Sequence, residues 1–392
     1  QVVLRVSIPN TEHSIKEMER LTSDEAEAKR ASKKELSDKF SPAICVANLP
    51  KRYIALKVMY FGPRFYGFAS EAQMGPTVES EIFEALQKTR LISGNKKELQ
   101  YSRCGRTDKG VSSVGQVISL FLRSNIKDTV ENNDNTSVSP DGEIDYVKVL
   151  NKVLPKDIRI TGWSSAPNDF SSRFSCLGRE YMYFFWRGNL DIEVMQNAGT
   201  KFIGEHDFRN FCKMDAANVQ NFKRRITSFE ILRCSEKFED DELWAVKIKG
   251  SAFLWHQIRC MVAVLFLIGQ RLESPSVIGE LLDIETTPRK PQYTMAPEIP
   301  LLLHCCEFDC LDFKCSTDAR RGLRVHLEKQ CRDYKLQAAI FHEALSSCCS
   351  SSESREGDPV KEGGKKKKSS CRHVPLMCRQ TGPSFDERRA KL

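Results

Sequence analysis

The sequence predicts an α+β fold built on a largely antiparallel sheet. Between Tyr53 and Asp309, segments with the two-residue alternation of strands are mixed with helical segments, without the regular strand–helix repeat of a parallel sheet. The chain has 392 residues, 40% hydrophobic and 29% charged, a balance typical of a globular protein with an ample core and polar appendages. The longest apolar stretch, Cys260 to Ile268, is far too short to span a bilayer, so we expect no membrane segment.

Composition divides the chain into four parts. In order they are a polar helical or flexible arm, a folded body, a charged helix and a mostly disordered tail: residues 1–48, 49–310, 311–345 and 346–392. The body has approximate halves 49–163 and 164–310, and the first half carries a polar insertion at 126–145. The end of the tail regains apolar character, which would allow it to fold back onto the body.

Five elements are predicted in the first half of the body, in the order strand, helix, strand, helix, strand: residues 53–60, 77–91, 114–122, 146–155 and 157–163. The first strand is indicated by Ile54, Leu56 and Val58, which alternate onto one face. The first helix is indicated by Thr77, an N-cap residue type followed by acidic residues in the first turn.

The second half continues with two strands flanking each helical region: strands at 179–187, 224–234, 242–250 and 297–309, and helices at 191–203, 254–269 and from Pro275. Trp244, Val246 and Ile248 show the alternation of a strand. The helix at 254–269 is apolar nearly all round and is therefore expected to be buried. Ser274 before Pro275 is typical of a helix start.

The turn Arg103–Val111 concentrates three cations, one carboxylate and two glycines in nine residues, directly before an apolar strand. Positive charge nearby favours the ionised form of an acid, so Asp108 has the character of a nucleophile or base. On local chemistry alone, an ordinary turn is the stronger interpretation. In that case Asp bonds its own backbone and Gly110 supplies a positive φ.

Four sequence motifs, in a fixed order along the chain, favour a functional role for Asp108 over an ordinary turn. "GRTDKGV" (105–111), "FSSRFSCLGREYMYFFW" (170–186), "FIGEHDFRNFCKMD" (202–215) and "GSAFLWHQIRCMVAVLFLIGQ" (250–270) resemble the TruA-like tRNA pseudouridine synthases. The sequences of the first and third motifs are most similar to those of the eukaryotic Deg1-type branch, which acts on the anticodon arm. The resemblance covers roughly residues 50–310.

The resemblance implies a pseudouridine synthase fold, with two ferredoxin-like halves sharing one sheet and a catalytic cleft along its middle. It implies isomerisation of uridine to pseudouridine in tRNA, at positions 38 and 39, by a homodimer that needs no cofactor or metal. Asp108 would be the nucleophile, attacking either the sugar C1′ or the base C6. Arg106 would help to extrude the base, Tyr181 would pack on it, and Arg259 would pair with Asp108.

Two of these assignments also have support, and an alternative, in the residues themselves. Arg259 stands in an apolar helix, where a charge is costly unless it is paired, although an arginine near a helix start can also reach solvent. Tyr181 has the ring needed to stack on an extruded base. It alternates with Tyr183 and Phe185, so at least one of the three is expected to be core.

The candidate RNA-binding side chains are six cations and one aromatic residue: Arg103, Lys109, Arg173, Phe174, Lys213, Arg224 and Arg225. Loop cations commonly contact the phosphate backbone and otherwise serve as plain surface charge. The formal net charge of +8 fits a polyanionic partner.

The fifteen cysteines are expected to be free thiols in a reducing compartment. A zinc cluster is conceivable in the segment that contains His304, Cys305, Cys306, Cys310, Cys315, His326 and Cys331. The spacings lack a paired CxxC, however, so incidental cysteines are the better interpretation. Cys104 has no accompanying Cys–His–Asn pattern and is interpreted as a small, partly buried residue.

Two other functions remain open at this level. A catalytically silent tRNA-binding or RNA-chaperone protein would use the same fold, although binding alone would not need a buried acid. A general RNA-binding module could use the sheet as a stacking platform. The tetralysine 365–368 is best interpreted as a solvated charge run, with a nuclear-import signal or an RNA-attracting tail as the alternatives. We expect the protein in the nucleus, the cytoplasm or both.

Overall fold

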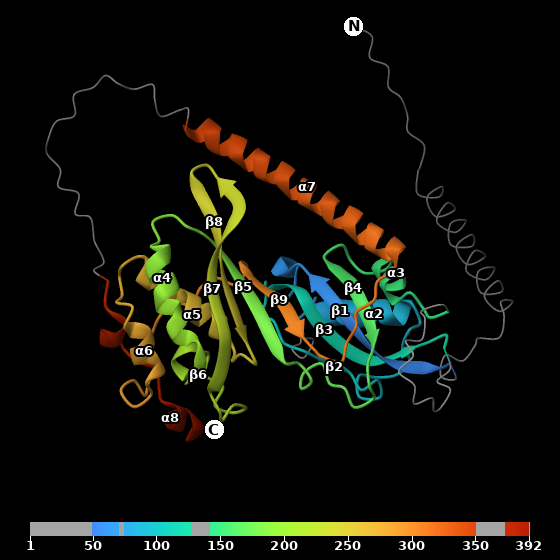
Figure 1. The fold of residues 1–392 in the computed structure, drawn as a ribbon, viewed down its shortest axis with the longest axis horizontal. Coiled ribbons are helices and arrows are strands. Elements are labelled where there is room, and N and C mark those ends of the chain that lie inside the picture. Colours follow the sequence, from blue (N-terminus) through green and yellow to red (C-terminus); the bar gives the residue numbers. More distant parts are fainter. Residues whose placement is uncertain (1–48, 70–73, 127–141, 350–372, 392) are drawn as a thin grey trace, which may run out of the picture. The chain divides into compact units, whose positions relative to one another are not determined.

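A nine-stranded sheet organises the body, and its strands follow the order β4-β1-β3-β9-β5-β8-β7-β6, with β2 beside β3 (Figure 1). Every pair of neighbours is antiparallel except β3 and β9. The predicted α+β fold on a largely antiparallel sheet is therefore confirmed. This computed structural model describes residues 49–69, 74–126, 142–349 and 373–391, so the predicted arm at 1–48, most of the insertion at 126–145 and the tetralysine lie outside the described residues.

The first half has the β-α-β-β-α-β... order of a ferredoxin-like unit, with strands arranged as fourth, first, third and second. Its strands are β1 (Lys51–Tyr60), β2 (Ser102–Arg103), β3 (Ser112–Arg123) and β4 (Ile158–Ser165), and its helices are α2 (Val78–Lys88) and α3 (Tyr146–Asn151). Thr77 caps α2 as predicted, accepting a hydrogen bond from the Ser80 amide. The helix ends three residues earlier than predicted, just before Arg90 adopts a left-handed conformation.

The second half repeats this arrangement. Its strands are β5 (Gly178–Trp186), β6 (Gly204–Asp207), β7 (Lys223–Phe238), β8 (Asp241–Gly250) and β9 (Leu301–Glu307), and its helices are α4 (Ile192–Gly199), α5 (Gln257–Gly269) and α6 (Val277–Leu282). Helix α5 packs nearly all of its side chains into the core shared with α4 and the sheet, as its composition predicted. It begins at Gln257 rather than Leu254 because His256 has a left-handed φ of 62°.

The start of α6 also differs from the prediction. Ser276, not Ser274, precedes the helix, and its side chain makes no capping hydrogen bond. The Ser274 hydroxyl instead accepts from the Ser276 amide at 3.2 Å, so the serine and proline form a turn before the helix.

The two halves meet along one edge of β3. Near its carboxyl end β3 pairs with β2, and near its amino end Ser112 and Ser113 pair with Leu302 and Leu303 of β9. Gly115 lets the strands approach here, because a Cβ at this position would lie 2.3 Å from the His304 carbonyl oxygen. The turn that carries Asp108 joins β2 to β3, so it leaves the sheet where the halves join.

Two C-terminal segments pack against the body. Helix α7 (Thr317–Cys349) coincides with most of the predicted charged stretch, and its first turns lie beside the first half (Figure 1). There a guanidinium nitrogen of Arg159 lies 3.1 Å from Nδ1 of His326. Residues 373–391 of the predicted tail fold back onto the second half, where Leu376 is fully buried and α8 (Phe385–Arg389) places Phe385 against Phe222. Among the described residues, no helix combines the length and apolar character that a bilayer crossing requires.

Candidate active site

Hydrogen bonds to the side chain and the backbone of Thr107 hold the Asp108 turn. The Thr107 hydroxyl shares a 2.8 Å hydrogen bond with the buried Tyr60, and the Thr107 carbonyl accepts from the Phe68 amide at 3.1 Å. Gly67 is required beside it, because its φ is 97° and a Cβ would lie 2.9 Å from the Thr107 oxygen. Gly110 supplies the positive φ of 81° that the turn itself needs.

The Asp108 carboxylate is 29% exposed and is contacted by two consecutive residues that lead into α5. The Trp255 indole donates to one carboxylate oxygen at 3.0 Å, and Nε2 of His256 lies 3.3 Å from the other. These contacts leave part of the carboxylate open to solvent while fixing its direction. A side chain held in this way is preorganised to act on a bound substrate.

His256 is mostly buried, and burial lowers its pKa despite the opposing effect of the Asp108 charge. The imidazole is therefore neutral at neutral pH, and the carboxylate beside Nε2 favours the tautomer that carries its proton there. Nδ1 is buried without a hydrogen-bond partner among the described residues. The ring can thus donate to Asp108 without neutralising its charge.

The predicted ion pair between Arg259 and Asp108 is not present, and this prediction is corrected. Arg259 is buried in α5, as expected of a charge that needs a partner, but it donates to Glu298 at 2.8 Å and to the Ala296 carbonyl at 2.7 Å. Glu298 in turn packs against the turn, since a Cβ on Gly110 would lie 2.9 Å from its Cγ. Arg259 therefore supports the Asp108 turn through Glu298.

Tyr181 lies in the middle of β5 and packs edge-on against Phe253, with ring centroids 5.1 Å apart. Burial raises the pKa of its phenol well above the usual value, so the hydroxyl stays protonated at neutral pH. Tyr183 and Phe185, on the same face, belong to the core, which confirms that at least one of the three aromatic residues is structural. The role of Tyr181 against a base remains a prediction.

Three candidate RNA-binding cations lie over exposed aromatic rings. Lys109 lies 4.5 Å from the centroid of Tyr66, Lys213 lies 4.1 Å from Trp255, and Arg173 lies 5.2 Å from Phe174. The Phe174 side chain is 81% exposed, which leaves an unusually large apolar surface in contact with water. The first two pairs flank Asp108 directly, since Lys109 follows it and Trp255 bonds to it.

The third pair is tied to the same turn by Arg179. Its guanidinium donates to the Cys104 carbonyl at 3.1 Å and to the Arg173 carbonyl at 2.7 Å. The backbone at Arg173 therefore lies beside the start of the Asp108 turn. Segments far apart in the sequence thus bring three cation–aromatic pairs to the neighbourhood of one carboxylate.

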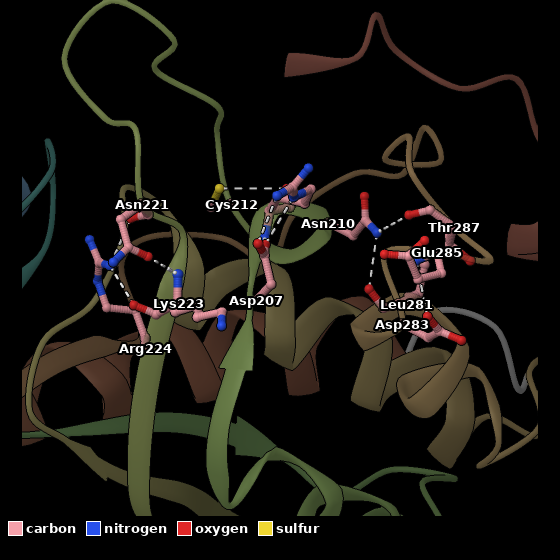
Figure 2. Close-up of polar contacts among 11 residues, drawn as sticks. Asp207, Asn210, Cys212, Asn221, Lys223, Arg224, Leu281, Asp283, Glu285 and Thr287 are labelled. Carbon is pink, nitrogen blue, oxygen red and sulfur yellow. Dashed lines mark hydrogen bonds and ion pairs between the residues drawn. The ribbon is translucent and has the colours of Figure 1, made fainter. Parts of the chain in front are cut away.

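The other cationic candidates differ in their surroundings. Arg106 and Arg225 are exposed. Arg103 is mostly buried and pairs with the buried Glu79 at 2.8 Å, which gives it a structural role in this conformation. Arg224 is half-buried and folds back to donate to the Asn221 carbonyl at 3.0 Å (Figure 2), and burial lowers its pKa. RNA contact by any of them stays a prediction.

A cavity of about 450 Å³ lies next to the carboxylate site, and His256 forms part of its wall. Its described lining includes four cations and no carboxylate: Arg209, Lys213, Lys290 and Arg388. Arg388 belongs to α8, so the C-terminal segment contributes to this basic surface.

The residues of the cysteine-rich segment 304–331 do not come together as a group of metal ligands. Among the described residues, the one group of metal-ligand types brought together is Cys104, Cys176 and Cys306, of which only Cys306 belongs to that segment. Cys104 is small and buried, as interpreted, with 3% of its surface exposed.

Sequence reasoning missed Trp255, His256 and Glu298. The first two lie inside the motif "LWHQIR", four and three residues before Arg259, and this position in the motif is the signal that could have identified them. Nothing in the local sequence around Glu298 marks it as the partner of a residue 39 positions away.

Two ferredoxin-like halves sharing one sheet, with a carboxylate turn at their junction, form the fold of the pseudouridine synthases. A family model for tRNA pseudouridine synthases matches residues 198–309. The tRNA pseudouridine synthase A of Methanoculleus marisnigri is 32% identical over 290 residues, covering 73% of this chain and 93% of its own length. This chain belongs to the tRNA pseudouridine synthase family.

Eukaryotic relatives are more similar in sequence. The tRNA pseudouridine(38/39) synthase of Bos taurus is 45% identical over 306 residues, covering 75% of this chain and 63% of its own. The enzyme of the same name from Saccharomyces cerevisiae is 46% identical over 297 residues, covering 74% and 65%. The chain thus spans less than two thirds of the length of these relatives.

Proposed function

We propose that this protein isomerises uridine to pseudouridine in tRNA, at positions 38 and 39, with Asp108 as the nucleophile and without a cofactor. The observation that carries the proposal is the Asp108 carboxylate itself. It is fixed by Trp255 and His256, partly open to solvent, and placed at the junction of the two halves in a chain of this family. A protein that only binds RNA would not need this arrangement.

The reaction requires a carboxylate held in a fixed orientation and a site that keeps the detached base bound until it is rejoined. Nucleophilic attack requires the ionised carboxylate, and the neutral His256 donates to it without taking its charge. The ion pair between Arg259 and Glu298 supports the turn at Gly110, which keeps the carboxylate in one position during the reaction. The reaction breaks the N-glycosidic bond of uridine, rotates the base and rejoins it through C5, so no atom is gained or lost.

The surface around Asp108 supports an RNA substrate. Exposed rings of Tyr66, Trp255 and Phe174, each with a cation over it, can stack on bases while the cations face phosphates. Extruding a base costs a few kcal/mol, least where pairing is weak. The end of the anticodon stem and its loop are such places, in agreement with the positions that the names of the eukaryotic relatives state.

The test is release of tritium from tRNA transcripts labelled at C5 of uridine, since forming the new bond at C5 expels that hydrogen. We expect release by the unaltered protein and none by Asp108→Ala or Asp108→Asn. Asp169→Asn, which alters an exposed loop carboxylate, is the matched control and should release tritium normally. Release by the Asp108 variants would refute this nucleophile.

The same assay separates the alternative function and the positions. Binding of tRNA without any tritium release would favour a catalytically silent tRNA-binding or RNA-chaperone protein. Transcripts in which the uridine at position 38 or 39 is replaced by cytidine, one at a time, should lose the corresponding part of the release. Unchanged release from the doubly substituted transcript would contradict the proposed positions.

The resemblance also leads us to propose a homodimer located in the nucleus, the cytoplasm or both. Light scattering coupled to size-exclusion chromatography measures the mass of the assembly directly, and a mass of one chain at micromolar concentration would contradict the dimer. Fluorescence microscopy of the full chain would test the location.

A further inference from the structure

Three thiols from separate parts of the chain meet in the core beside the Asp108 turn. Cys104 follows β2, Cys176 precedes β5, and Cys306 lies on β9, and their sulfur atoms are all within 4.8 Å of one another. Their exposed fractions are 3%, 8% and 8%. They share one core cluster with apolar neighbours that include Val117 and Leu303.

We propose that Cys104, Cys176 and Cys306 bind one divalent thiophilic metal ion, such as zinc, through three thiolates. Three points within 4.8 Å of one another always have a centre no more than roughly 2.8 Å from each of them, and a zinc–sulfur bond is about 2.3 Å long. Each sulfur would have to move inward by at most about 0.5 Å, which a cysteine rotamer can supply. No backbone rearrangement is needed.

The charge of the site also fits a divalent ion. Three thiolates and a divalent ion carry a net charge of −1, and Arg179 lies beside them with +1. Its guanidinium donates to four carbonyls, those of Cys104, Arg173, Cys176 and Ser251, and no carboxylate among the described residues lies within ion-pair distance of it. A half-buried cation surrounded by neutral acceptors is costly unless a negative charge compensates it. A monovalent ion would leave the thiolates with −2, so the balance favours a divalent one.

The metal would have a positioning role rather than a place in the reaction. Cys104 lies near the start of the Asp108 turn, Cys176 follows the loop that carries Phe174, and Cys306 lies on the strand that joins the halves. One ion would therefore fasten the turn, the loop and β9 to one another. This inference goes beyond the proposed function and does not depend on it.

The test is zinc binding by the full chain under reducing conditions, measured by competition with a chromophoric chelator, together with the melting temperature. We expect one tightly bound ion per chain and a higher melting temperature with zinc. Cys176→Ser should lose both effects. Cys212→Ser removes a thiol that is equally buried but outside the group, and should keep both. Equal zinc binding by the two variants would overturn the proposal, because the ion would then sit on other cysteines.

A second measurement covers the case in which Cys176→Ser does not fold. X-ray absorption at the zinc edge counts the ligands in the unaltered protein. Three sulfurs with one lighter ligand are expected. Four sulfurs, or a shell made mainly of nitrogen and oxygen, would contradict the three-thiolate site, and so would a folded chain that binds no zinc.

Discussion

The buried carboxylate of Glu79 offers the sharpest test of how the Asp108 turn is held. Glu79 is in the first turn of α2, its side chain is 1% exposed, and it pairs with Arg103 at 2.8 Å and with Lys96 at 2.6 Å. Arg103 ends β2, directly before the turn, and is itself only 16% exposed. The pair therefore fastens α2 to the strand from which the turn departs.

Glu79→Gln keeps the size of the side chain and removes the charge that both cations contact. Breaking a buried ion pair costs about 3–5 kcal/mol, and because Lys96 is 41% exposed we expect the lower end, about 3 kcal/mol. The melting temperature should fall by roughly 4–5 °C, because the entropy of unfolding grows with the size of the body. Urea denaturation followed by circular dichroism measures the change in the free energy of unfolding.

Glu84→Gln is the matched control. Glu84 is on the same helix but is 58% exposed and pairs only with Lys88, one turn along, so its loss should cost less than about 0.5 kcal/mol. A cost below about 1 kcal/mol for Glu79→Gln would refute the argument from burial. Strong loss of tRNA affinity by folded Arg103→Gln would show that Arg103 contacts RNA and is not only structural.

Three further predictions concern the site itself. Because burial lowers the pKa of His256, its neutral form is favoured in the folded state, and the unfolded chain takes up the proton first as the pH falls. Stability should decline below about pH 6.5, whereas tritium release should decline only at a lower pH, where the folded-state imidazole itself takes up a proton. His256→Asn should reduce both acid dependences, and identical pH profiles would contradict this. Arg259→Met should lower kcat by about tenfold or more, with little change in the Kd for tRNA, because it removes the brace behind the turn; a change in Kd alone would contradict this. Phe174→Ala should weaken tRNA binding by about 1 kcal/mol, whereas Leu177→Ala, a nearby exposed residue, should not; equal effects would argue against stacking.

Local patterns determined much of the fold. Short stretches of sequence were enough to predict the alternation in β1 and β8, the Thr77 cap and the apolar helix α5. Periodicity and capping act over only a few positions along the chain. The order of four motifs was enough to indicate the family and to single out Asp108. Element boundaries shifted by two or three residues where a backbone conformation intervened, as at His256 and Arg90.

Only the tertiary structure decided which groups meet. The sequence required a partner for Arg259 and the resemblance pointed to Asp108, whereas the structure places Glu298 there, because an ion pair depends on distance in space and not on spacing along the chain. In the same way, folding alone brought Trp255 to Asp108 across 147 positions and gathered three cysteines from different elements. The sequence by itself therefore determined most of the elements and the family and selected Asp108 as the candidate nucleophile, while side-chain packing determined what holds that carboxylate in place.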